Sequence, residues 1–139
     1  MFISSSPFQR SRFLVLLALS SLMMGCGHSL RELPDFDAKT WRSDPYACRN
    51  MRSSAVPALV SAKEELYEAR ANDVTALLGP PDEEELRAGT EKVYYYYLEP
   101  GTHCEGRRAR SGAPCLSIRF GPIGTVTEVL IDPLTPRSN

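Results

Sequence analysis

The side chains best suited to chemistry lie close together in the second half of the chain, at His103 and Cys104, with two further thiols at Cys115 and Cys48. A cysteine nucleophile needs an imidazole within hydrogen-bond reach and a third group that orients the ring. Neighbouring side chains usually point apart, and no Asp or Asn lies nearby to orient His103. The four residues would supply a zinc site with four ligands, but their spacing is not a specific zinc pattern. We therefore predict no catalytic residue, no metal and no cofactor, and a protein that is not an enzyme.

A fourth cysteine, Cys26, ends an apolar segment that begins at Phe13 and follows Arg10 and Arg12. A basic start, a short apolar run and a small residue before the cleavage point form the pattern of a secretory signal peptide. The run is too short to be predicted as a membrane span. Its ending, Gly25-Cys26, resembles a bacterial lipobox, in which the cysteine is acylated and becomes the new N-terminus. We predict lipidation at Cys26. An ordinary signal peptide with an incidental cysteine is the alternative.

Lipidation predicts where the protein resides. Several acyl chains hold a protein firmly on a bilayer, at about 0.8 kcal/mol for each buried methylene. The residue after Cys26 is Gly27, rather than the Asp that resembles an inner-membrane retention signal. We therefore expect a protein anchored by lipid to the outer membrane of the cell envelope, facing the periplasm.

The charge balance excludes one class of partner. The chain of 139 residues has 16 basic and 17 acidic residues, and the leader contains two of the basic residues and none of the acidic ones. Nucleic-acid binding needs a basic surface, so we expect no nucleic-acid partner. The length suits one small domain, and export would place its cysteines where they can form disulfides.

The chain divides into four predicted parts. Residues 1–25 form the signal peptide, 26–43 a lipid-anchored tether, 44–133 an α+β domain and 134–139 a flexible tail. The tether has few large apolar residues, and neither a helical nor a strand period is sustained in it.

The first half of the domain is predicted to be helical. Asp44 and Pro45 suit a helix start, and a break is expected near Val56 because Pro57 removes a backbone donor. A second, short helix ends at Gly79, which tolerates the left-handed conformation. Beyond the break, one apolar face comprises Val56, Leu59, Val60, Leu66 and Tyr67.

The second half is predicted to be a sheet. Residues 93–98, 116–120 and 125–131 have the composition and alternation of strands, and 84–87 fits a short additional one. Two helices followed by three or four antiparallel strands predict an α+β fold in which the helices cover one sheet face. The predicted core comprises Leu77, Leu78, Leu116, Ile118, Phe120 and Val126.

Two charged groups are interpreted as solvent-exposed loops. Consecutive carboxylates at 82–85 point apart, which disfavours a cation site. Arg107, Arg108 and Arg110 would allow contact with anionic lipid or a partner, but a solvated loop is the simpler interpretation.

Four consecutive tyrosines are divided between the two faces of their strand. Alternation sends Tyr94 and Tyr96 to one face and Tyr95 and Tyr97 to the other. We expect one pair in the core and the other packed along the outer face, rather than an exposed stacking platform for a peptide or glycan.

The three cysteines that remain after lipidation allow one disulfide and one thiol outside it. A bridge from Cys104 to Cys115 would close a short loop, and one from Cys48 to Cys104 would tie the first helix to the sheet. Either would contribute about 2–4 kcal/mol. The residues alone leave both pairings open.

The chain resembles the SmpA/OmlA, or BamE-like, group of small outer-membrane lipoproteins. The resemblance rests on Asp73-Val74, Leu77-Leu78-Gly79-Pro80-Pro81-Asp82, the aromatic strand, Leu116–Phe120 and Gly124-Thr125-Val126. It implies a fold similar to that of β-lactamase inhibitor protein, with two helices on an antiparallel sheet. A closer resemblance, to uncharacterised lipoproteins of this shape, rests on Trp41, Asp44, Cys48, Arg52, the Leu-Gly-x-Pro-Asp turn and Tyr97-Leu98-Glu99-Pro100 with Cys104.

This resemblance favours a disulfide between Cys48 and Cys104, which leaves Cys115 outside the bridge. For function it implies a non-enzymatic, membrane-tethered binding or assembly module with an unknown envelope protein as its partner. The alternative is a periplasmic inhibitor or binder of a soluble enzyme.

Overall fold

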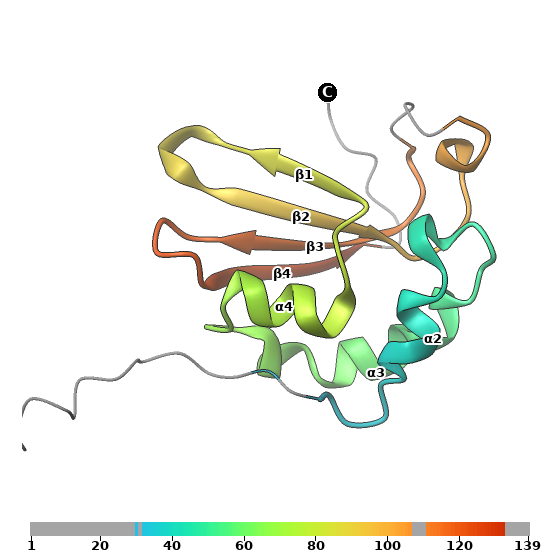
Figure 1. The fold of residues 1–139 in the computed structure, drawn as a ribbon, viewed down its shortest axis with the longest axis horizontal. Coiled ribbons are helices and arrows are strands. Elements are labelled where there is room, and N and C mark those ends of the chain that lie inside the picture. The colour runs from blue at the N-terminus through green and yellow to red at the C-terminus, as the bar shows by residue number, and fades with distance from the viewer. Residues whose placement is uncertain (1–29, 31, 107–110, 133–139) are drawn as a thin grey trace, which may run out of the picture.

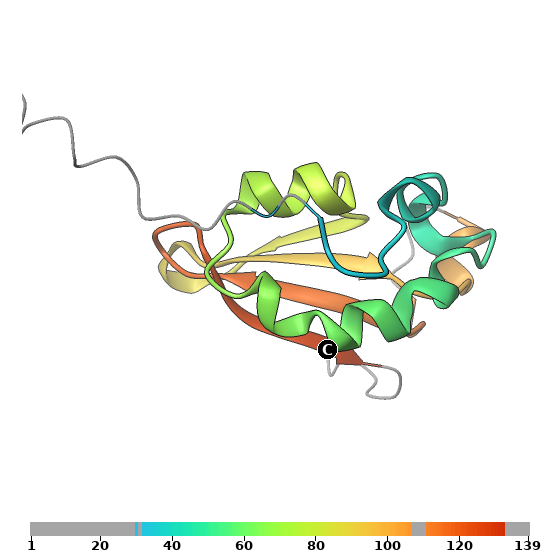
Figure 2. The ribbon, with the colours of Figure 1, turned by 90° about the horizontal axis from the view of Figure 1, so that it is seen from below.

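The computed structural model describes residues 30, 32–106 and 111–132, which form a four-stranded antiparallel sheet with helices packed on one of its faces (Figures 1 and 2). The strands pair in the order of the sequence. They are β1 (Glu83–Leu86), β2 (Lys92–Tyr97), β3 (Cys115–Phe120) and β4 (Val126–Asp132). The predicted α+β class, with helices before the sheet, is confirmed.

The helical layer consists of short pieces. The described α-helices are α2 (Ala38–Arg42), α3 (Val56–Ser61) and α4 (Ala71–Leu78), and the 3-10 turns between and beside them are η2 (Pro45–Ala47), η3 (Arg52–Ala55) and η4 (Lys63–Leu66). Two more 3-10 turns, η5 (Ala88–Thr90) and η6 (Thr102–Cys104), lie beside β2.

The helix boundaries differ from those predicted. The break expected near Val56 falls where η3 ends at Ala55 and α3 begins at Val56. Pro57 lies in the first turn of α3, where its missing N–H is not needed. Asp37 caps α2 by accepting hydrogen bonds from the N–H groups of Lys39 and Thr40. Asp44 does not cap a helix, because its carboxylate bonds to amides further along the chain. Gly79 ends α4 with a φ of 83°, as predicted.

The segment predicted to be a tether is largely part of the folded body. Leu30, Leu33 and Trp41 lie in the main core, with exposures of 6%, 4% and 0%. Their apolar side chains gain free energy by leaving water, which draws the segment onto the domain. The folded body therefore extends from Ser43 back to Leu30, a correction to the predicted tether of 26–43.

The C-terminal end of α4 is capped by side chains from other elements. The last carbonyls of a helix have no partner within the helix. Here Arg42 donates to the carbonyls of Ala76 and Leu77, at 3.3 and 2.7 Å. The indole Nε1 of Trp41 donates to Leu78 O at 3.0 Å, and the hydroxyl of Tyr96 donates to Gly79 O at 3.0 Å. These bonds fix α4 against both α2 and the sheet.

The main core lies between the helices and the inner face of the sheet. All six predicted core residues are buried, with exposures between 0% and 4%: Leu77, Leu78, Leu116, Ile118, Phe120 and Val126. Leu59 and Leu66 join them, but Val60 is 55% exposed. The prediction that Val60 shares one buried face with them is wrong, because the helix changes to a 3-10 turn soon after Val60 and its periodicity is interrupted.

The four tyrosines alternate across β2 as predicted. Tyr94 and Tyr96 lie in the main core, and Tyr95 and Tyr97 belong to a second apolar cluster on the other face. Each is at most 7% exposed, so none of them offers an open stacking platform. In the part of the chain that the structure describes, no helix is long and apolar enough to cross a bilayer.

Candidate functional site

A buried polar cluster lies where β2 ends and the chain segments around α2 meet the sheet. At its centre Arg52, the first residue of η3, pairs with Asp82, which directly precedes β1. The Arg52 Nη1 to Asp82 Oδ2 distance is 2.5 Å, and each side chain is 2% exposed. Burying two charges is costly unless they are paired and fully hydrogen-bonded, so their other contacts decide whether the cluster is stable.

Asp82 has its hydrogen-bonding capacity filled. Its Oδ1 accepts from the backbone N–H of Tyr46 at 2.9 Å, and its Oδ2 accepts from the N–H of Tyr97 at 2.8 Å. Nη2 of Arg52 adds a longer contact of 3.4 Å. Asp82 therefore joins η2, η3 and β2 through one carboxylate.

Arg52 is held by carbonyls and aromatic rings as well. It donates to Tyr97 O at 3.1 Å and to Trp41 O at 3.3 Å. Its guanidinium carbon lies 4.6 Å from the Trp41 ring centroid and 6.0 Å from that of Tyr96. Both rings attract the cation through their π faces. This cluster holds the fold together, and its charges are already matched by each other.

The loop beside this cluster adopts an unusual backbone. Tyr46, Ala47 and Asn50 have φ values of 62°, 55° and 56°, a region that non-glycine residues rarely occupy. Asp44 holds the loop by accepting from the N–H groups of Arg49 and Met51, at 2.9 and 2.8 Å. The surrounding contacts thus impose a conformation that these residues do not favour alone.

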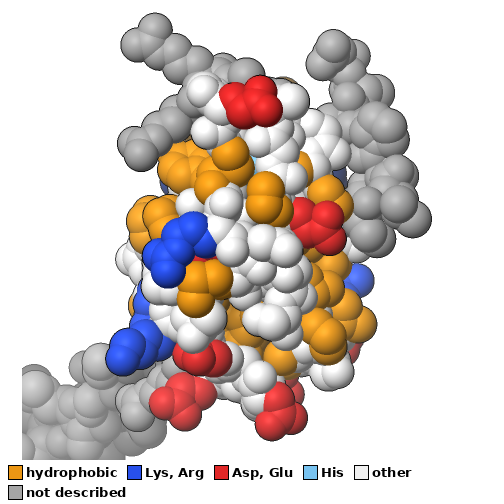
Figure 3. Space-filling view, turned by 90° about the vertical axis from the view of Figure 1, so that its right-hand side faces the viewer, with side chains coloured by type: hydrophobic (Ala, Val, Ile, Leu, Met, Phe, Trp, Pro, Cys, Tyr) orange, Lys and Arg blue, Asp and Glu red, His pale blue; other side chains and the backbone are white. Residues whose placement is uncertain are grey.

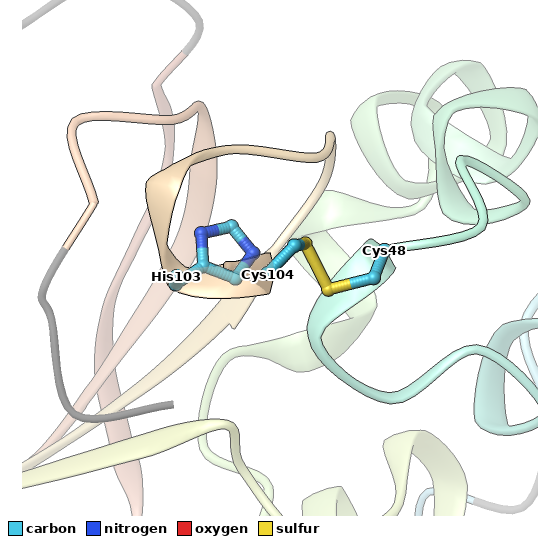
Figure 4. A group of neighbouring side chains, drawn as sticks. All are labelled: Cys48, His103 and Cys104. Atoms are coloured by element: carbon cyan, nitrogen blue, oxygen red, sulfur yellow. A yellow bond between two sulfur atoms is a disulfide. The ribbon is translucent and has the colours of Figure 1, made fainter. Parts of the chain in front are cut away.

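A disulfide between Cys48 and Cys104 joins this loop to η6, with a Cα–Cα distance of 5.6 Å (Figure 4). It confirms the pairing that the resemblance favoured over Cys104–Cys115. Both half-cystines are exposed, whereas Cys115 keeps its thiol and is buried at the start of β3. Figure 3 views this end of the molecule, where hydrophobic, basic and acidic side chains are interspersed.

His103 is buried beside the disulfide. Its ring stacks on Tyr97, with centroids 3.7 Å apart and planes 8° from parallel. Its Nε2 lies 2.7 Å from Tyr46 O, and its Nδ1 has no hydrogen-bond partner among the described residues. The hydroxyl of Tyr97 donates to Glu83 and accepts from Ser111 N.

His103 lies beside a disulfide rather than a free thiol. Cys104 is bonded to Cys48, so it carries no thiol to act as a nucleophile in this state. Of the four residues considered for zinc, three come together, since ligand atoms of Cys48, His103 and Cys104 lie within 4.8 Å of one another. Cys115 is outside this group and pairs with Tyr97 across the sheet.

A shallow groove of about 360 Å³ lies elsewhere on the helical layer, and its floor and walls come from the N-terminal segment, η3, α3 and η4. Proline and alanine side chains make it partly apolar, and two carboxylates add negative charge. It is lined by Pro34, Asp35, Ser54, Pro57, Ala58, Ser61, Ala62 and Glu65.

Tyr96, Lys92 and Asp37 are among the described residues whose pKa values are shifted from their ordinary values. Burial raises the pKa of Tyr96. The hydrogen bond from Lys92 to Glu84, at 3.2 Å, and the neighbouring Tyr94 raise the pKa of Lys92. Hydrogen bonds from Thr40 lower the pKa of Asp37 at the start of α2. All three shifts arise from structural contacts.

The sequence indicated some of these residues and missed others. The run 82–85 was interpreted as a solvated loop, but Asp82 is a buried ion-pair partner and Glu83–Glu85 belong to β1. The sequence feature that set Asp82 apart from the other carboxylates was its position at the end of the Leu-Gly-Pro-Pro-Asp turn. Cys26 and the basic residues 107, 108 and 110 lie outside the described residues.

Comparisons with protein-family models, with curated proteins and with solved structures found no match to this chain.

Proposed function

We propose that this protein is a lipid-anchored, non-enzymatic binding or assembly module of the bacterial outer membrane, facing the periplasm. Acylated Cys26 is the proposed anchor, at the end of the apolar leader. The resemblance of the chain to SmpA/OmlA lipoproteins supports the same function. The partner we expect is a protein of the envelope.

One observation carries this proposal: Leu30, four residues after Cys26, is buried in the core. Four residues span at most about 14 Å when fully extended. Acylation of Cys26 would hold the folded body against the bilayer, not on a long spacer. A domain held so close to the membrane suits the binding of a membrane protein.

We assign the groove on the helical layer as the contact surface for that partner. Pro34 and Asp35 line it and follow Leu30 closely in the chain, so acylation of Cys26 would keep the groove near the bilayer. Asp35 and Glu65 bring carboxylates to walls that are otherwise partly apolar. Complementary charge guides association and selects partners, so the expected partner segment carries apolar side chains and a basic residue.

The alternative function is that of a periplasmic inhibitor of a soluble enzyme. Such an inhibitor would bind the enzyme through an exposed outer face of the sheet. Val93, Tyr95 and Tyr97 on that face are at most 5% exposed, which makes the face a weaker candidate than the groove. We therefore keep the anchored module as the proposal.

Site-specific photo-crosslinking in living cells tests this function. A photoreactive residue at Ser61, inside the groove, should crosslink a membrane protein, and Glu65→Lys should abolish the product. The matched control places the same probe at Ile123, which is 86% exposed outside the groove. Equal products at both sites, or a soluble enzyme as the captured protein, would contradict the proposal, and the latter would support the inhibitor.

A further inference from the structure

We propose that the corner formed by Cys48, His103 and Cys104 is a metal site that opens when the disulfide is reduced. In the reduced protein the two thiolates and the imidazole bind one Zn²⁺ ion. With the disulfide intact, the sulfur ligands are bonded to each other and the site is closed. This inference does not depend on the lipid anchor or on the groove.

The donor atoms are already gathered for such a site. Ligand atoms of the three residues lie within 4.8 Å of one another (Figure 4). Bond lengths of about 2.3 Å to sulfur and 2.0 Å to nitrogen place the ligands of tetrahedral zinc about 3.5–3.8 Å apart. Once the disulfide is reduced, the two sulfurs would separate to these distances by rotation of the exposed Cys48 and Cys104 side chains beside a fixed imidazole.

His103 is oriented for this role by its packing. The stack on Tyr97 fixes the ring, and Figure 4 shows one ring nitrogen pointing towards the disulfide and the other away from it. Nε2 lies 2.7 Å from Tyr46 O, and Sγ of Cys48 lies 3.6 Å from the same oxygen. At 2.7 Å Nε2 and this oxygen are hydrogen-bonded, so a metal on Nε2 would replace that ring proton, and the fourth position of a tetrahedral set would be open to water.

The second ring nitrogen has a position suited to zinc binding. A metal on Nε2 requires the ring proton on Nδ1, and ligating histidines usually donate that proton to a neighbouring acceptor. Nδ1 is buried, has no hydrogen-bond partner among the described residues and adjoins Gly101. The hydroxyl of Ser111 lies close to Gly101 as well: a Cβ atom placed on Gly101 would come within 2.2 Å of the Ser111 oxygen. Ser111 Oγ accepts from Ala113 N and does not bond Nδ1 in the oxidised protein, so metal binding would need a small rearrangement to give Nδ1 an acceptor.

The chemistry of opening the site is a thiol–disulfide exchange with a dithiol reductant. The dithiol gives two electrons and two protons and becomes a disulfide, and Cys48 and Cys104 take them up as two thiols. Binding of Zn²⁺ then displaces both thiol protons to solvent. The reductant can reach the bridge because both half-cystines are exposed.

The test uses the full-length chain with Cys26→Ser, purified in detergent, so that no other exposed thiol is present among the four cysteines. Co²⁺ is the spectroscopic probe, because cobalt–thiolate bonds give charge-transfer absorption. The reduced protein should bind one equivalent of Co²⁺ with this absorption, and Zn²⁺ should displace it. The oxidised protein should show none. His103→Gln should weaken binding at least about tenfold, as loss of even an outer-shell partner does.

Matched variants separate this site from nonspecific thiol binding. Cys115→Ser removes a thiol outside the corner and should leave the absorption unchanged, whereas Cys48→Ser should reduce it to that of one thiolate or less. The proposal is wrong if the reduced parent gives no charge-transfer band. It is equally wrong if His103→Gln binds as tightly as the parent, or if the reduced chain is unfolded by circular dichroism and does not refold on addition of Zn²⁺.

Discussion

Arg52 and Asp82 form an ion pair in the interior of the domain, with Nη1 and Oδ2 2.5 Å apart and both side chains 2% exposed. The pair joins η3 to the turn that precedes β1, and through Asp82 it also holds the amides of Tyr46 and Tyr97. Neither charge can be hydrated where it lies, so each depends on the other.

Removal of one member of this ion pair is expected to destabilise the folded protein strongly. Asp82→Ala leaves a buried guanidinium without its counter-charge, and Arg52→Met leaves a buried carboxylate. Each should lower the free energy of unfolding by about 3–5 kcal/mol. The double variant should cost less than the sum of the two, because it leaves no buried charge. Urea denaturation of all four proteins measures this coupling.

The pair between Arg119 and Glu128 is the matched control for that experiment. Its atoms lie 3.1 Å apart, but its side chains are 35% and 40% exposed. Glu128→Ala should cost less than about 1 kcal/mol. If Asp82→Ala cost no more than Glu128→Ala, the ion pair would not be central to the fold.

The disulfide is expected to be the second main source of stability. It links residues separated by 56 positions, and closing a loop of that length in the unfolded chain corresponds to about 4 kcal/mol. Replacing both Cys48 and Cys104 with Ser should lower stability by that order. Cys115→Ala should leave the bridge intact, which non-reducing peptide mapping shows directly.

Truncation of a side chain to alanine should destabilise the protein much more on the inner face of the sheet than on the outer face. Ile118 is 0% exposed on the inner face, so Ile118→Ala should cost about 2–5 kcal/mol. Leu130 is 48% exposed on β4, and Leu130→Ala should cost much less. Equal losses in urea denaturation would mean that the inner face is not the core.

Alkaline pH should weaken the fold through Tyr96. Burial raises its pKa above the ordinary value, so in the folded state it keeps its proton when the unfolded chain has lost it. This contribution is fully present below the unfolded pKa of about 10 and is lost as pH rises above it. Stability should fall by up to about 1.4 kcal/mol per pH unit from this group. Tyr96→Phe should show a shallower loss between pH 9 and 11.

Much of the fold was predictable because its signals are local. Alternation in Leu116–Phe120 and the helical spacing of Val74, Leu77 and Leu78 each follow from one element that buries one face. The same reasoning divided the tyrosines of β2 correctly between two faces. The α+β class then follows from the order of helices and strands.

The polar cluster was not predictable in this way. Arg52 and Asp82 are 30 positions apart, and nothing local distinguishes a buried Asp from the half-buried and exposed carboxylates that follow it. Whether Leu33 and Trp41 are buried likewise depends on what packs over them, and a segment without periodicity gives no sign of it. Long-range contacts decide both cases.

The mass of the mature protein, extracted from the membranes of a Gram-negative bacterium that expresses the full chain, tests the lipid anchor most directly. We predict a chain that begins at Cys26 and carries acyl groups on that residue, and a Cys26→Ser variant that is either released from membranes or left unprocessed. A mature chain that begins at another residue, or a Cys26 that carries no lipid, would contradict the proposal that this protein acts as a lipid-anchored module.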